Sequence, residues 1–242
     1  MPKDSNFAAY DSPEVISLFA GYSMLFPSEK YLFAKYVPAG ASILDLGVGG
    51  GRTTPVLAAK AKRYVGVDYV PGMVDACASK FPNYEFVCAD AAALDVFADA
   101  SFDIVVFSFN GLDVLPVLKK RAECLEEVRR VLSPNGVFLF SSHNARMLAH
   151  TPSLKIEPLL RAFIKTWPYS RELIRSGAFL RGAGYYRDVS HTGTEFYSST
   201  PKLIAHELGI AGFELIETTH DHKPRRVPTF LIPWHYYVAR RL

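Results

Sequence analysis

Short apolar runs alternate regularly with longer amphipathic segments through the first part of the chain, and this alternation restricts the fold most strongly. The strand-like runs are 42–46, 64–68, 84–87, 102–109 and 136–142, and the helix-like segments are 53–60, 72–80 and 117–132. Strands that alternate with helices are typical of βαβ units and of a parallel sheet covered on both faces. The sequence therefore predicts an α/β fold, with the run Ile104-Val105-Val106-Phe107 buried on both sides of the sheet.

The 242 residues are expected to form one domain, because single domains commonly contain about 50 to 250 residues. Residues 1–40 are predicted to be helical, with Ser12 capping a helix that begins at Pro13 and a second helix beginning at Pro27. Residues 41–144 form the predicted core and 145–200 an inserted cap of helices and a hairpin, since so long an irregular loop is rare. Residues 201–242 are predicted to form a helix followed by the last two strands.

Composition places the chain among ordinary globular proteins, with 49% apolar and 21% charged residues. It contains no apolar run of the roughly 20 residues that a bilayer span requires, and the first residues lack a signal core. We therefore expect a cytoplasmic protein with no membrane partner. The thiols of Cys77, Cys88 and Cys124 fall in no Cys-x-x-Cys pair and are predicted to be reduced and buried.

A glycine-rich turn follows the first predicted strand and precedes a helix, in Asp45-Leu46-Gly47-Val48-Gly49-Gly50-Gly51. Glycines allow close backbone approach to a ligand, and a helix start offers unpaired N–H groups. A dinucleotide-binding protein would place a third glycine where Arg52 stands, which argues against a nicotinamide-dependent oxidoreductase.

Asp68 and Asp90 end the next two predicted strands. Carboxylates at the ends of successive parallel strands lie along one edge of a sheet, where Asp68 can accept ribose hydroxyls and Asp90 an adenine amino group. The alternative is that both simply cap the helices that follow them.

Together with Ser101-Phe102-Asp103-Ile104-Val105 and the run 127–136 before strand five, these motifs make the chain resemble class I S-adenosylmethionine-dependent methyltransferases. The resemblance covers nearly all of the chain outside the cap. It implies a Rossmann-like, seven-stranded, mostly parallel sheet with helices on both faces and one antiparallel strand. It also implies S-adenosyl-L-methionine as methyl donor and S-adenosyl-L-homocysteine as product.

The resemblance further implies a role for each residue of the predicted cofactor site. Gly47, Gly49 and Gly51 would border the methionine moiety, and Asp45 would face its amino group directly or through water. Asp68 would hold the ribose. The adenine would be bound by Asp90 and the Ala91 amide and covered by Tyr69 and Met73.

The acceptor is expected above the ends of strands four and five, where His143 and Asn110 are the candidate catalytic residues. Histidine suits proton abstraction near neutrality, and Asn110 can hydrogen-bond the acceptor. The alternatives are a strand-end histidine bonded to backbone and an ordinary turn asparagine. The tetrapeptide beginning at Ser108 lacks the Asn/Asp-Pro-Pro-Tyr/Phe box of methyltransferases acting on DNA bases, which favours a small-molecule acceptor over a nucleic acid.

The predicted cap is basic, with eight Lys/Arg against four acidic residues, and carries the aromatic pairs Tyr185-Tyr186 and Phe196-Tyr197. These rings either wall an apolar or sugar-like acceptor or attach the cap to the sheet. A basic cap leaves an RNA or protein acceptor open, and a catalytically silent binding subunit is a further alternative. The fragment from His220 to His222 has too few ligands for a closed metal site, so no metal is predicted. The oligomeric state is not determined by these patterns.

Overall fold

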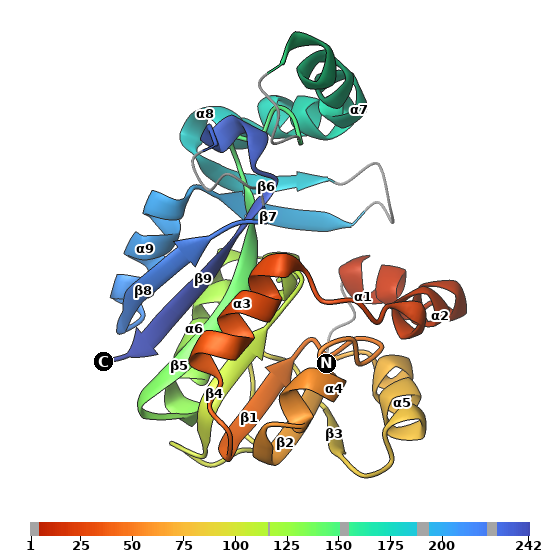
Figure 1. Cartoon of the computed structure of the whole chain (residues 1–242), viewed down its shortest axis with the longest axis vertical. Helices are drawn as coiled ribbons and strands as arrows, with labels where there is room; N and C mark the ends of the chain where they lie inside the picture. The colour runs from red at the N-terminus through yellow and green to blue at the C-terminus, as the bar shows by residue number, and fades with distance from the viewer. Residues whose placement is uncertain (1–4, 116, 151–154, 188–193, 222–226) are drawn as a thin grey trace.

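The protein is described here from a computed structural model covering residues 5–115, 117–150, 155–187, 194–221 and 227–242 (Figure 1). Its helices are α1 (Ser5–Tyr10), α2 (Pro13–Gly21), α3 (Pro27–Tyr36), α4 (Thr54–Ala58), α5 (Pro71–Lys80), α6 (Leu118–Val131), α7 (Ile156–Arg175), α8 (Ala178–Arg181) and α9 (Pro201–Ile210), with 3₁₀ turns η1 (Gly111–Val114) and η2 (Thr229–Leu231). Its strands are β1 (Ala41–Leu46), β2 (Ala61–Asp68), β3 (Glu85–Cys88), β4 (Phe102–Phe107), β5 (Leu132–Asn144), β6 (Ala183–Arg187), β7 (Glu195–Ser199), β8 (Phe213–Thr219) and β9 (Trp234–Arg241).

The predicted mostly parallel sheet is confirmed. Strands β3, β2, β1, β4 and β5 are parallel neighbours in that order, and β9 and β8 follow beyond β5. Strand β9 runs antiparallel to both β5 and β8 and is therefore the reversed strand that was expected.

Within the described residues the sheet has nine strands rather than the seven expected, because the β6–β7 hairpin of the inserted segment joins it. Strand β5 extends to Asn144, whereas its pairing with β4 ends at Phe140. The exposed backbone groups at the end of β5 require partners, and β7 supplies them by pairing with His143 and Asn144. The hairpin consequently lies across the end of the sheet where the parallel strands finish (Figure 1).

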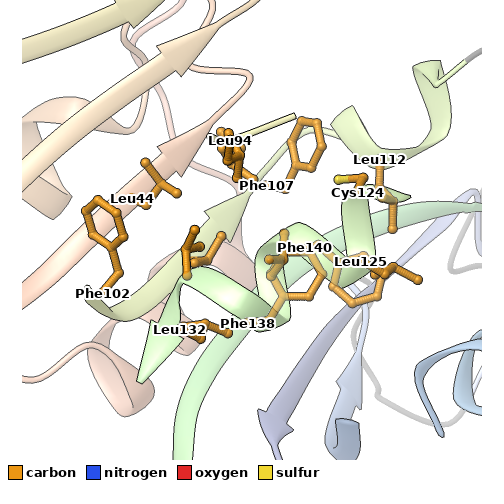
Figure 2. Close-up of a cluster of buried hydrophobic side chains, with 14 of the residues drawn as sticks. Leu44, Leu94, Phe102, Phe107, Leu112, Cys124, Leu125, Leu132, Phe138 and Phe140 are labelled. Carbon is orange, nitrogen blue, oxygen red and sulfur yellow. The ribbon is translucent and has the colours of Figure 1, made fainter. Parts of the chain in front are cut away.

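Two apolar layers cover the sheet, one on each face. The layer beneath α6 and α9 contains side chains such as Leu44, Phe138 and Leu125, which Figure 2 shows packed between β1, β5 and α6. The opposite layer contains Ile43 and Leu32 beneath α3 and α4. Adjacent residues of one strand point to opposite faces. The central β4 run 104–107 is buried throughout, as predicted.

Several predicted boundaries were wrong by a few residues. Strand β4 ends at Phe107, because Phe109 and Asn110 adopt positive φ angles of 55° and 62° that extended backbone does not allow. Strand β5 begins at Leu132, which pairs with Phe102 before the turn residues. Cys88 is exposed, contrary to expectation, because it ends β3 at the edge of the sheet.

The N-terminal helices pack onto the glycine-rich turn. Glu29 of α3 binds both terminal nitrogens of the Arg52 guanidinium, at 2.6 and 2.7 Å, and accepts a hydrogen bond from Ser108. A Cβ atom on Gly50 would lie 2.3 Å from backbone atoms of Phe19 and Ala20 in α2. Only glycine therefore allows α2 to pack against this turn without displacement.

Replacing Gly50 by alanine is expected to push α2 away from the turn. The overpacking should lower the free energy of unfolding by about 1–3 kcal/mol. Amide hydrogen exchange of residues 5–21 should accelerate, and thermal unfolding should report the lost stability. The matched control is Gly209→Ala in α9, where an added Cβ meets nothing within 4 Å. The Gly209→Ala protein should have a free energy of unfolding higher by up to about 1 kcal/mol, because alanine favours the helix more than glycine does. Unchanged exchange over residues 5–21 in Gly50→Ala would contradict this packing.

Candidate functional site

A cavity of about 1150 Å³ lies at the edge of the sheet where the parallel strands end. Its floor comes from the glycine-rich turn and the ends of β2 to β5, and its walls from α1, α2, α7 and β7. The predicted site residues that line it are Gly47, Gly49, Asp68, Tyr69, Met73, Asp90, Ala91, Asn110 and His143. The fold thus brings both halves of the predicted site together around one space.

Asp68 is buried at the end of β2 and binds the backbone on two sides. Its Oδ2 accepts a hydrogen bond from the Gly49 N–H at 2.8 Å, and its Oδ1 accepts one from the Val70 N–H at 3.0 Å. Burial raises its pKa to about 6, although these backbone hydrogen bonds oppose the rise. The carboxylate thus holds the backbone just before α5, whose first turn has no side-chain cap, and it also lines the cavity.

Asp90 lies two residues beyond the end of β3, in a turn that no helix follows, so the helix-cap alternative is wrong for this residue. Its Oδ1 accepts the Ala92 N–H at 2.9 Å, and its Oδ2 lies 3.5 Å from Lys120 Nζ. Its side chain is only partly buried and lines the cavity beside Ala91. A polar ligand at this end would meet both a carboxylate and a lysine.

Tyr69 and Met73 form the apolar wall next to these acids. Met73 is 2% exposed, and Tyr69 makes an edge-to-face contact with Phe7 of α1 at 5.5 Å between ring centroids. Phe19 of α2 lies against Gly49 and lines the same space. The N-terminal helices thereby complete the wall opposite the strand ends.

Two predicted ligand-facing residues do not line the cavity. The Oδ2 atom of the buried Asp45 carboxylate accepts hydrogen bonds from Thr53 Oγ1 at 2.5 Å and Tyr64 OH at 2.8 Å. Gly51 packs instead under α5, where a Cβ would lie 2.4 Å from Phe81. Both residues shape the turn, and a contact of Asp45 or Gly51 with the methionine moiety stays a prediction.

Asn110 and His143 lie side by side at the other end of the cavity. Asn110 Nδ2 is 3.2 Å from His143 Nε2, and the Asn110 backbone N–H donates to Ser141 Oγ at 2.8 Å. The Asn110 Oδ1 atom is buried without a hydrogen-bond partner among the described residues. A buried unpaired acceptor in a cavity is a position at which a ligand donor would be stabilised.

Asp113 holds His143 from the opposite side. Its Oδ2 lies 2.9 Å from His143 Nδ1 and accepts the His143 backbone N–H at 2.7 Å, while its Oδ1 accepts Ser142 Oγ at 2.7 Å. A carboxylate beside Nδ1 favours the tautomer with the proton on Nδ1 and leaves Nε2 as the acceptor.

A fully buried arginine extends this network to α9. Arg121 donates to Asp113 at 3.1 Å and binds both carboxylate oxygens of Glu207, at 2.6 and 3.2 Å. Sequence reasoning gave Asp113 and Arg121 no role, because their partners lie far away along the chain. A polar residue in the loop after β4 was the only available signal for Asp113.

The aromatic pairs of the inserted hairpin divide between its two faces. On one face, Phe196 lines the cavity and Tyr186 packs beside it, with Tyr186 OH bonded to Tyr169 OH of α7 at 2.7 Å. On the other face, the Tyr197 ring lies over the Arg121 guanidinium and Tyr185 OH donates to the Leu115 carbonyl. Both expected functions, walling the cavity and attaching the hairpin, are thus represented.

The histidine fragment near the C-terminus has a structural use in the part that is described. Asp221 accepts the Ser28 N–H at 2.8 Å and the Tyr236 hydroxyl at 2.7 Å, which fixes the start of α3. His222 lies outside the described residues.

The chain matches known proteins of one family. Residues 44–140 match the family described as "Methyltransferase domain". A demethylmenaquinone methyltransferase of Clavibacter sepedonicus is 32% identical over 61% of this chain and 66% of its own length. The first curated relatives are matched over 35% to 66% of their length, so the chain aligns with less than two thirds of each.

Solved structures extend the likeness to the whole fold. The Burkholderia thailandensis 1,6-didemethyltoxoflavin-N1-methyltransferase, solved with S-adenosylhomocysteine, superimposes with a TM-score of 0.64 at 18% identity, covering 100% of this chain and 91% of that one. The [4+2]-cyclase SpnF also reaches 0.64, at 14% identity, covering 99% of this chain and 96% of that one.

The strand order, the glycine-rich turn and the acids at the strand ends define an α/β protein of the class I methyltransferase type. Residues 44–140 therefore form a methyltransferase domain, and the chain has the fold of class I S-adenosylmethionine-dependent methyltransferases.

Replacing Asp68 by alanine is expected to abolish measurable S-adenosylmethionine binding, since it removes the carboxylate predicted to accept the ribose hydroxyls and releases the Gly49 N–H. In the native protein, binding should weaken as pH falls through about 6, because the raised pKa lets Asp68 protonate there. Above that pH the folded protein must keep the buried Asp68 carboxylate ionised, which destabilises it. The free energy of unfolding of the ligand-free protein should therefore rise as pH falls from about 6 towards 4.

Isothermal titration calorimetry between pH 5 and 8 measures the binding change, with Asp75→Ala in α5 as the control carboxylate outside the cavity lining. Native-like affinity in Asp68→Ala would contradict the assignment.

Proposed function

We propose that this protein transfers a methyl group from S-adenosylmethionine to an oxygen or nitrogen atom of a small-molecule acceptor. The observation that carries the proposal is the continuity of the cavity between Asp68 and Asp90 at one end and Asn110 and His143 at the other. Its volume of about 1150 Å³ exceeds the range of about 300–1,000 Å³ for ordinary ligand pockets. Two small molecules can therefore occupy it together.

The residues at the first end fit the cofactor of the family. Carboxylates at Asp68 and Asp90 suit the hydroxyl donors of a ribose and the amino donor of an adenine. Gly47 and Gly49 bring bare backbone to the cavity, with φ angles of 58° and 53° that favour glycine. When bound, S-adenosylmethionine supplies an activated methyl group on a sulfonium, so the protein must chiefly position the acceptor.

His143 is the proposed base at the second end. Asp113 keeps the proton on Nδ1, so Nε2 can take a proton from an acceptor hydroxyl or amine. In the ligand-free protein the Asn110 side-chain amide hydrogen-bonds to His143 Nε2. A bound acceptor must replace that hydrogen bond with one from its own hydroxyl or amine. The unpaired Asn110 Oδ1 would then receive a donor from the acceptor and fix its orientation.

Aromatic side chains favour a small acceptor over RNA or protein. Phe26, Phe109, Trp234, Tyr169 and Phe196 line the cavity around His143, and they suit an apolar or planar compound better than a phosphate backbone. The relatives named above include methyltransferases for demethylmenaquinone and 1,6-didemethyltoxoflavin, which are small molecules. A macromolecular acceptor would be favoured by steeply salt-dependent RNA binding.

Turnover separates an enzyme from a silent binding subunit, a distinction that matters because the cyclase SpnF shares the fold. The decisive experiment incubates the protein with methyl-labelled S-adenosylmethionine and a panel of phenols, quinols and heterocyclic amines. Labelled product together with calorimetric cofactor binding supports the proposal. Absence of binding at millimolar cofactor would eliminate it, and binding without turnover on any acceptor would favour the silent subunit.

His143→Ala is expected to lower kcat by about 10²–10⁴ with the acceptor that the panel identifies, because a positioned base contributes on that scale. The dissociation constant for S-adenosylmethionine should stay unchanged, since His143 lies at the far end of the cavity. Added imidazole should restore part of the rate. The matched control is the exposed His206→Ala in α9, and equal rates in both variants would remove His143 from the reaction.

Asp113→Asn tests the positioning of that base. An asparagine amide can donate to Nδ1, which reverses the tautomer and places the proton on Nε2, so kcat should fall with little change in KM. Glutamate at this position would keep the charge and should retain more activity than asparagine. Circular dichroism and the thermal midpoint confirm folding, because Asp113 also pairs with buried Arg121. Full activity in a folded Asp113→Asn protein would contradict the positioning role.

A further inference from the structure

Helix α7 carries large apolar side chains that the described part of the protein leaves uncovered. They lie at intervals that place them along one side of an α-helix. The exposed members are Ile156 (85%), Leu160 (56%), Phe163 (37%), Ile164 (64%), Trp167 (41%) and Ile174 (41%). We call these six residues the α7 apolar stripe. Figure 1 shows α7 at one end of the molecule, beyond the β6–β7 hairpin.

The α7 apolar stripe is separate from the side of the helix that attaches it to the protein. Ser170 and Leu173 face the molecule and are buried, and Tyr169 bonds to Tyr186 of β6. An ordinary surface helix has one apolar side, which it buries against its own core. Helix α7 has a second apolar side, the α7 apolar stripe, which is exposed. Six exposed apolar residues in one row mark an interaction surface.

Positive charge accompanies the stripe. The helix carries four basic residues, Arg161, Lys165, Arg171 and Arg175, all exposed, against two acids, Glu157 and Glu172. The N-cap residue Lys155 adds a further exposed positive charge. The Phe163 and Trp167 rings lie against each other at 5.3 Å between centroids. Exposed aromatic and aliphatic residues beside arginine and lysine characterise helices that lie in the headgroup region of a bilayer.

We infer that α7 docks on an anionic lipid surface, with the α7 apolar stripe inserted and the helix's exposed arginines against the headgroups. A second copy of this chain is a poorer occupant, because two stripes brought together would also bring together two basic helices. An anionic bilayer complements both the apolar row and the charge. This surface attachment needs no spanning segment, and no helix in the described part of the chain is long and apolar enough to cross a membrane.

Docking through α7 would also place the cavity beside the lipid. Lys165, Thr166, Pro168 and Tyr169 of the same helix line the cavity, so the helix separates the bound ligand from the docked surface. If the proposed methyl transfer is correct, an apolar acceptor dissolved in the bilayer has a short route to His143. This consequence rests on the proposed function, whereas the docking itself does not.

The experiment is flotation of the full chain with phosphatidylcholine vesicles containing about one third phosphatidylglycerol, and with pure phosphatidylcholine vesicles. Binding is expected to the anionic vesicles and to weaken with salt. The variant Leu160→Gln/Ile164→Gln should lose about tenfold or more in affinity, because two inserted apolar side chains are removed. The Arg175→Gln variant should bind the anionic vesicles with roughly fivefold lower affinity, because one positive charge is removed.

Two controls make the result specific. Ile210→Gln removes an equally exposed apolar residue from α9 and should bind vesicles like the native protein. Calorimetry with S-adenosylmethionine should give the same affinity in all variants, so a failure of vesicle binding with intact cofactor binding overturns only the docking.

A dimer that the double variant dissociates, without vesicle binding, would assign the stripe to a second copy and overturn the inference. Equal binding of the native protein and the double variant would overturn it as well.

Discussion

The Asp68 carboxylate connects the three parts of the chain on which the cofactor end of the cavity depends. It ends β2, and it holds the Gly49 N–H of the turn after β1 and the Val70 N–H at the start of α5. Two backbone donors offset part of the cost of burying this charge, and the remaining cost appears as a pKa raised to about 6. The turn is thereby fixed where bare backbone faces the cavity.

A second buried carboxylate organises the opposite end in the same way. Asp113 accepts hydrogen bonds from the Ser142 hydroxyl and from the backbone N–H and Nδ1 of His143, and Arg121 joins it to Glu207 of α9. A buried ion pair of this kind contributes little net stability, yet removal of one partner costs about 3–5 kcal/mol because a charge is left unpaired. The network therefore fixes one geometry of the histidine and depends on the C-terminal helix for it.

The segments outside the central strands determine what can enter between these two ends. Helices α1 and α2 pack on the glycine-rich turn through Phe19 and Gly50, and the β6–β7 hairpin extends the sheet over the acceptor end. Helix α7 has two uses, since Tyr169 faces the cavity and the α7 apolar stripe faces outward. The inserted segment thus carries both residues that line the cavity and the outward-facing α7 apolar stripe.

Local patterns in the sequence determined the strand and helix order, the Ser12 and Pro27 helix starts, and the convergence of Gly49, Asp68 and Asp90. Strand alternation follows from side-chain periodicity, and the ends of parallel strands meet at one edge in every such sheet. These features could therefore be predicted residue by residue, together with the placement of His143 at the end of β5.

Contacts between distant residues decided the rest. Asp45 accepts hydrogen bonds from Thr53 and Tyr64. Gly51 packs against Phe81, and Arg121 pairs with Glu207. Strand β7 joined the sheet only because β5 extends beyond β4 and leaves backbone groups that need partners. No periodicity along the chain encodes such pairings, since they depend on which side chains meet once the elements have packed.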